Sequence, residues 1–165
     1  MLEKVFNDLV NFEGLSLKVY RCPTGKLTIG YGRNLEDNGI STTEAELLLL
    51  FDIVKLISQL DRKVDFWLVQ PVNVRIVILQ MAFQLGVGGL LGFRKFLAAL
   101  KENDYELAKK EMFDSKWAQQ TPNRVKKLSE YLDYPFQNND LEQWKKDFNM
   151  IQGFTEFMEN ITLFD

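Results

Sequence analysis

Apolar and polar positions follow two different periods along the first part of the chain. Residues 2–12 carry apolar side chains at helical spacing, and Gly14 follows as a usual helix stop. Residues 16–21 and 26–31 alternate with a period of two instead, as strands do. Between them, Cys22-Pro23-Thr24-Gly25 has proline and glycine where a type I turn favours them. The pattern predicts a helix followed by a β-hairpin.

The rest of the chain has a helical pattern almost throughout. Ser41 and Glu44 have the spacing of a capping box, which opens a helix. Pro71 and Pro122 stand where helices begin, and Gly86 follows a nearly all-apolar segment that it is expected to end. We expect helices over residues 42–60, 72–86, 90–103, 104–113, 122–132 and 140–152, with a tail over 153–165.

Composition excludes several kinds of chemistry. The chain has no histidine and one cysteine, which excludes Ser-His and Cys-His pairs, His-based zinc sites and an internal disulfide. A formal net charge of −3 argues against nucleic-acid binding, which needs a basic surface. No apolar run reaches ~18 residues, and the N-terminus is too acidic and interrupted for a secretory signal. We therefore expect no metal, no cofactor, no nucleic acid and no stable membrane insertion.

Three residues around the predicted hairpin are candidates for chemistry. Glu13 is placed at a helix C-terminus, where the negative end of the helix dipole favours the protonated carboxyl that a general acid needs. Cys22 lies in the turn and Thr28 on the returning strand. Gly30 and Gly32 permit a close approach of the backbone to a ligand or another strand. A hairpin folded against the helix end would bring Glu13, Cys22 and Thr28 to one cleft.

The spacing of these residues matches a known pattern. The order and spacing resemble the active-site signature of phage-type lysozymes, glycoside hydrolase family 24. In this chain eight residues separate Glu13 from Cys22, five separate Cys22 from Thr28, and Ile-Gly-x-Gly follows. Most members have Asp where this chain has Cys22. The sequence Gly-Arg-Asn-Leu at 32–35 is similar to a branch of the family that carries this motif, and a subset of members has the cysteine.

The resemblance continues beyond the hairpin, roughly over residues 2–132. Segments 80–86, 92–93 and 115–124 are similar to the helical lobe of the family, in the same order. The resemblance implies a single lysozyme-like domain over 1–165, of the α+β class and mostly α. A small active-site lobe with a short antiparallel sheet would span about 13–60. A long helix would connect it to a helical lobe of about 61–152, which also includes helix 2–12.

The function implied by the resemblance is that of an endolysin. Such an N-acetylmuramidase cleaves the β-1,4 bond between N-acetylmuramic acid and N-acetylglucosamine, with Glu13 as general acid. Thr28 would position a water molecule, and Arg124 would pair with Glu13. The substrate-binding positions implied are Asn34, Phe83, Phe96 and Glu111. Phe96 and Glu111 replace small polar residues of other members, so they would change the shape and charge of the cleft.

The role of Cys22 leaves three alternatives. In the Asp form of the family a carboxylate activates water on the far face of the sugar, which inverts the anomeric centre. A thiolate would need a lowered pKa for this role, and the flanking Arg21 and Lys26 are hypothesised to lower it. If Cys22 is inert, Glu13 alone would serve a lytic transglycosylase. A catalytically silent wall-binding module with the same fold is the third alternative.

Expectations about partners and location follow from the same resemblance. Peptidoglycan glycan strands would be the substrate, and the protein would be a monomer. With no export signal recognised in the sequence, it would stay in the host cytoplasm until lysis and act on the periplasmic peptidoglycan. A separate holin would then be needed to reach the wall.

Overall fold

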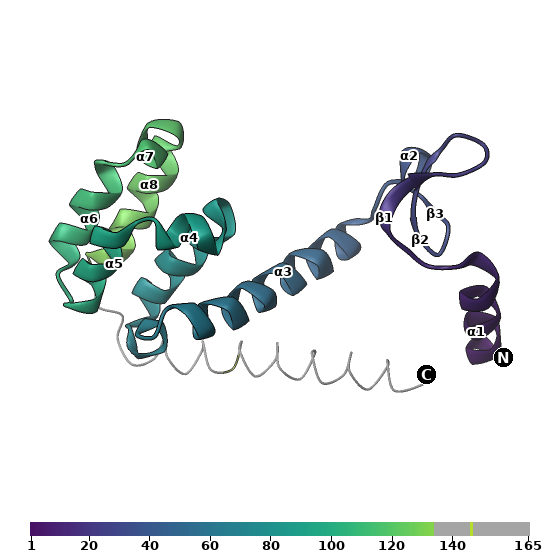
Figure 1. Ribbon diagram of the computed structural model, residues 1–165, viewed down its shortest axis with the longest axis horizontal. Coiled ribbons are helices and arrows are strands. Elements are labelled where there is room, and N and C mark those ends of the chain that lie inside the picture. Colours follow the sequence, from purple (N-terminus) through teal and green to yellow (C-terminus); the bar gives the residue numbers. More distant parts are fainter. Residues whose placement is uncertain (134–145, 147–165) are drawn as a thin grey trace. The chain divides into compact units, whose positions relative to one another are not determined.

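The computed structural model describes residues 1–133 and residue 146, and it consists of two compact units. The first unit spans Met1–Leu49 and the second begins at Leu50, so the boundary falls inside one long helix. Figure 1 shows the elements of each unit.

The first unit contains the predicted helix and hairpin. Helix α1 (Leu2–Glu13) ends at Gly14, whose φ of 67° an L side chain rarely adopts. Strands β1 (Ser16–Arg21), β2 (Leu27–Gly30) and β3 (Arg33–Asn34) form an antiparallel sheet in that order, followed by α2 (Leu35–Asn38). The helix and the hairpin are therefore confirmed, whereas β3 and α2 were not predicted.

Helix α3 (Thr42–Lys63) crosses the boundary between the units and has 22 residues. Its first turn has the predicted capping box. The backbone amide of Ser41 donates to Glu44 Oε2 at 2.7 Å, and the backbone amide of Glu44 donates to Ser41 Oγ at 3.2 Å. Only the second half of the helix has buried residues, Ile57 and Leu60, which join the core of the second unit.

The second unit is helical. Its elements after α3 are η1 (Trp67–Val69), α4 (Val72–Leu91), α5 (Arg94–Lys101), α6 (Tyr105–Phe113), α7 (Lys116–Gln120), α8 (Pro122–Ser129) and η2 (Glu130–Leu132). The predicted stop at Gly86 appears as a break inside α4, where φ is 71° and ψ is 158°. The chain is helical again after the break, up to Leu91. Asp104 caps α6 by accepting a hydrogen bond from the backbone amide of Leu107 at 3.0 Å. Helix α7 was not predicted.

The core of the second unit is built on α4. Val74, Ile78 and Met81 of this helix are fully buried and belong to a cluster that includes Trp67 and Phe96. Within the described residues, α4 is also the one helix long and apolar enough to cross a membrane, and 44% of its most apolar window is buried in the protein. A core helix passes this test of length and composition as readily as a membrane span.

The observed architecture agrees with the predicted fold class: mostly helical, with a small antiparallel sheet and a long helix that follows the sheet in the sequence and precedes the other helices. The structure groups α1 with the sheet. Its assignment to the helical lobe, and the lobe boundaries near residue 60, stay predictions. The helix expected over 140–152 and the tail expected over 153–165 lie outside the described residues.

Candidate active site

The carboxyl group of Glu13 lies against Gly32. Glu13 is the last residue of α1, and its side chain is exposed. A Cβ atom on Gly32 would lie 3.2 Å from Glu13 Oε2, closer than ordinary van der Waals contact. Gly32 also has a φ of 80°, which favours glycine. The residue between β2 and β3 thus leaves the space that the Glu13 carboxyl occupies.

Cys22 and Thr28 are held by one carbonyl oxygen. The turn between β1 and β2 closes with a hydrogen bond from the amide of Gly25 to Cys22 O at 2.8 Å. The carbonyl oxygen of Lys26 then accepts from the amide of Cys22 at 3.0 Å and from Thr28 Oγ1 at 3.1 Å. Thr28 is buried, with 3% of its surface exposed, and it pairs with Tyr20 on one side and Asn34 on the other.

Hydrogen bonds lower the pKa of the Cys22 thiol to about 7. The largest cause is the hydroxyl of Thr24, whose Oγ1 lies 3.0 Å from Cys22 Sγ. Partial burial acts in the opposite direction, while the backbone of Thr24, the hydroxyl of Thr28 and the backbone of Lys26 lower the pKa further. Near neutral pH the sulfur is therefore ionised in a large fraction of molecules, as a base or nucleophile requires.

The side chains of Arg21 and Lys26 do not produce this shift, contrary to the hypothesis from the sequence. Arg21 Nη1 donates to the carbonyl oxygen of Gly25 at 2.7 Å. Lys26 Nζ forms an ion pair with Asp37 at 2.8 Å. Neither side-chain cation is among the causes of the lowered pKa of Cys22, and each is engaged by another group. Thr24 is not among the residues predicted from the sequence; the signal for it is a hydroxyl two residues after the cysteine in a predicted turn.

Asn34, a predicted substrate-binding residue, has a local role in the first unit. It is the N-cap of α2, and its Oδ1 accepts from the amide of Asp37 at 3.1 Å. Its Nδ2 donates to Asp37 Oδ2 at 2.9 Å. The cap fixes the Asn34 side chain against Asp37, while its backbone is the register partner of Thr28 in the sheet. Contact with a substrate stays a prediction for this residue.

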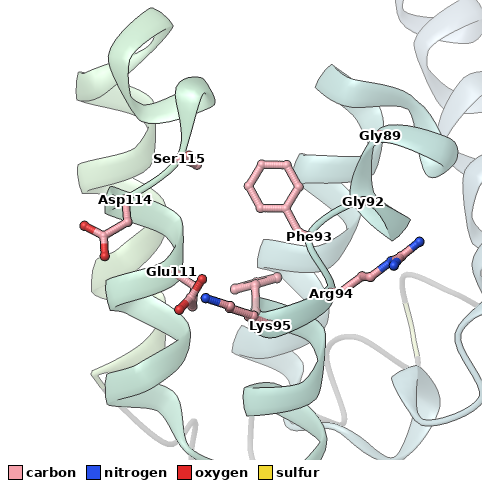
Figure 2. A pocket seen from close by; sticks show the side chains of 9 residues that line it. Gly89, Gly92, Phe93, Arg94, Lys95, Glu111, Asp114 and Ser115 are labelled. Carbon is pink, nitrogen blue, oxygen red and sulfur yellow. The ribbon is translucent and has the colours of Figure 1, made fainter.

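Phe96 and Glu111 line a pocket of about 520 Å³ in the second unit. Figure 2 shows Lys95 of α5 and Glu111 of α6 extending toward each other, with Phe93 above them. Arg94 and Asp114 add one positive and one negative charge to the lining. Phe96 itself is 1% exposed and belongs to the core. Glu111 is thus the more accessible of the two predicted substrate-binding residues.

Arg124 lies in another pocket of the second unit, of about 380 Å³, together with Gln80, Asn123 and Lys127. No acidic side chain lines this pocket. Phe83 is 44% exposed, so it is not a core residue in the described structure. The structure thus gathers Glu13, Cys22, Thr28 and Asn34 in the first unit and Phe83, Phe96, Glu111 and Arg124 in the second. The pairing of Glu13 with Arg124 stays a prediction.

Metal ligands do not cluster in the part of the chain that the structure describes. No group of three or more His, Cys, Asp or Glu side chains there has an arrangement that could hold a metal ion.

Comparison with known proteins identifies the family. The phage lysozyme family matches residues 10–131. The chain is 30% identical over 145 residues to the pre-baseplate central spike protein Gp5 of Enterobacteria phage T4, covering 71% of this chain and 25% of that protein. It is 40% identical over 57 residues to the probable T4-type lysozyme 1 of Dictyostelium discoideum, covering 34% of each.

A third relative is covered over most of its length. The endolysin of Acyrthosiphon pisum secondary endosymbiont phage 1 is 32% identical over 115 residues, covering 68% of this chain and 75% of that protein. The chain thus spans a quarter to a third of the first two relatives and three quarters of the third. Because the family match covers most of the sequence and includes Glu13, Cys22 and Thr28, the chain belongs to the phage lysozyme family.

Proposed function

We propose that the chain is a peptidoglycan hydrolase of the endolysin type, an N-acetylmuramidase that cleaves the β-1,4 bond between N-acetylmuramic acid and N-acetylglucosamine and so leads to cell lysis. The observation that carries the proposal is the placement of the Glu13 carboxyl against Gly32, in the connection that follows the strand of Thr28, while Cys22 lies in the turn that precedes that strand. Gly32 follows Thr28 by four residues, at most about 14 Å of chain. Membership of the phage lysozyme family supports the same assignment.

Glu13 is the proton donor in this proposal. Its carboxyl protonates the glycosidic oxygen as the bond from C1 of muramic acid to that oxygen breaks, and the sugar gains positive charge. An exposed carboxyl at a helix end is accessible to a glycan strand. The departing strand leaves with a free hydroxyl group, and Glu13 is left as a carboxylate.

Cys22 and Thr28 handle the water in this proposal. The water attacks C1 from the far face and loses a proton to the Cys22 thiolate, so a new C1–O bond forms with inversion. Thr28 Oγ1 already donates its proton to Lys26 O, which leaves its lone pairs to accept a hydrogen bond from the water. Proton exchange with solvent then returns Cys22 to the thiolate and Glu13 to the acid. This assigns the chain to the branch of the family with Cys in place of Asp and a Gly-Arg-Asn-Leu motif.

Mass spectrometry of the products tests the proposal. Purified peptidoglycan is digested with the protein and with the Glu13→Gln variant, and the soluble fragments are compared. We expect muropeptides with free reducing ends from the protein and at least about 100-fold less release from the variant. Products that end in 1,6-anhydro-muramic acid would instead indicate a lytic transglycosylase with Glu13 alone. No release of fragments by the protein beyond that of the variant would leave the silent wall-binding module as the remaining alternative.

The biological setting is proposed on the same basis. Peptidoglycan of the periplasm is the substrate, reached from the host cytoplasm after a holin has permeabilised the inner membrane. Lysis of cells that express the protein together with a holin, and not of cells that express it alone, is the expected result. The monomeric state stays a prediction that sedimentation measurements would test.

A further inference from the structure

The hydroxyl of Thr24 is directed at the sulfur of Cys22. Thr24 Oγ1 lies 3.0 Å from Cys22 Sγ, well within hydrogen-bond distance for sulfur. In the described part of the chain this hydroxyl has no other hydrogen-bond partner. Its side chain is exposed in the turn between β1 and β2, so packing against a core does not account for its position.

Backbone hydrogen bonds of the turn fix Cys22 and Thr24 relative to each other. The amide of Gly25 donates to Cys22 O at 2.8 Å, and the amide of Cys22 donates to Lys26 O at 3.0 Å. Arg21 Nη1 closes the outside of the turn by donating to Gly25 O at 2.7 Å. Thr24 lies between these three contacts, so its hydroxyl is presented to the sulfur by a backbone that is fixed on both sides.

Ionisation of Cys22 determines the direction of the hydrogen bond. A neutral thiol can donate or accept, but a thiolate can only accept, so Thr24 must donate to it. Thr28 also lowers the pKa of the sulfur, but its one hydroxyl proton is donated to Lys26 O at 3.1 Å in the structure. Thr24 is therefore the hydroxyl that lies against the sulfur with no competing acceptor among the described residues. Hydrogen bonds to a charged acceptor are stronger than neutral ones, so this contact favours the thiolate.

We propose that Thr24 is a positioning residue, whose hydroxyl donates a hydrogen bond to Cys22 Sγ and holds the thiolate oriented in the turn. Its effect on catalysis rests on the proposed function, in which the thiolate accepts a proton from the attacking water. The hydrogen bond itself does not depend on that function. The lowered pKa of Cys22, for which the Thr24 hydroxyl is the largest cause, agrees with the geometry.

Alkylation of Cys22 as a function of pH tests the hydrogen bond. Cys22 is the single cysteine of the chain, so intact mass spectrometry after iodoacetamide treatment reports on one thiol. We compare the protein with Thr24→Val, Thr24→Ala and Thr24→Ser, and with Thr43→Val as a control at an exposed position on α3. The midpoint of the rate against pH is used, because a thiolate of higher pKa is also more nucleophilic and the rate at one pH combines both effects.

The expected midpoint for the protein is about 7. Thr24→Val and Thr24→Ala should move it upward toward the ordinary value of ~8.5, which lowers the ionised fraction at pH 7 by up to about 15-fold. Thr24→Ser, which keeps the hydroxyl, and Thr43→Val should keep the midpoint near that of the protein. An unchanged midpoint in both hydroxyl-free variants, or an equal shift in Thr24→Ser, would overturn the proposal. Circular dichroism verifies that each variant is folded.

Digestion of peptidoglycan then tests the link to catalysis. The acid limb of kcat/KM against pH reports the free enzyme's base, so it should move upward in Thr24→Val by the same amount as the alkylation midpoint. A shifted alkylation midpoint with an unshifted acid limb would overturn the positioning role in catalysis. If the protein itself releases no fragments, the proposed function fails instead, and the alkylation result still decides the hydrogen bond.

Discussion

Replacing Gly32 by alanine should reduce activity through the position of Glu13. The added Cβ would lie 3.2 Å from Glu13 Oε2, so the carboxyl must move by a few tenths of an ångström. A misplacement of 1 Å in an active site can cost about 100-fold, which scales to a loss of about 3- to 10-fold here. Gly32 also has a φ of 80°, so alanine should destabilise the fold by about 1 kcal/mol.

Gly30→Ala is the matched control for this prediction. Gly30 has a similar φ of 66°, but a Cβ there would meet no atom within 4 Å. Both variants should therefore lose a similar free energy of unfolding, about 1 kcal/mol, while only Gly32→Ala should show the additional 3- to 10-fold loss in kcat. Urea denaturation gives the free energies, and digestion of purified peptidoglycan gives kcat. Equal activities in the two variants would refute the reasoning that Gly32 positions the Glu13 carboxyl.

Three further predictions concern Cys22, in two experiments, and one helix cap. Cys22→Ala should lower the rate of peptidoglycan digestion about 100-fold, whereas Cys22→Asp should keep a base and move the acid limb toward pH ~4; equal rates in both variants would contradict a role for the thiolate. Because the pKa of Cys22 is lowered to about 7 in the folded protein, its stabilising effect is present at pH 9 and is lost as the pH falls through 7. The difference in melting temperature between the protein and Cys22→Ser should therefore shrink from pH 9 to pH 6. A constant difference would contradict a stabilising effect of the Cys22 thiolate. Asp104→Ala should remove the hydrogen bond to the amide of Leu107 and cost about 1 kcal/mol of stability, with Asp104→Asn costing less in the same denaturation experiment.

Local chemistry explains which parts of the fold were predictable. Gly14 and Gly25 adopt positive φ values, which other residues avoid. A glycine at such a position therefore marks the end of a helix or a turn in the sequence. The capping box of Ser41 and Glu44 is equally local. Strand β3 has two residues and forms by pairing with β2, so it is too short to show a periodic pattern in the sequence. Gly86 breaks the helix as expected, but the chain resumes turning because Val87 and Leu90 are buried in the core.

The positions of two candidate site residues in the hairpin were predictable, and the electrostatics around them were less so. The positions of Cys22 and Thr28 in the hairpin followed from the turn sequence and the strand period, and both are found there. The cause of the lowered pKa was not predictable from the neighbouring cations. Whether Lys26 acts on the sulfur depends on whether another acid engages it, and Asp37 lies eleven residues away in sequence. Such competition between partners appears only when the side chains are placed in space.

The absence of histidine gives Cys22 an unusual weight in the response of the chain to pH. Histidine and perturbed cysteine are the side chains that change charge near neutral pH, and this sequence offers one cysteine with a pKa of about 7 and no histidine. Loss of that one proton makes the formal net charge of −3 more negative by one unit. Electrophoretic mobility measured across neutral pH should therefore include a step of about one charge that Cys22→Ser removes, so the ionisation of one turn in a small hairpin becomes visible in the charge of the protein.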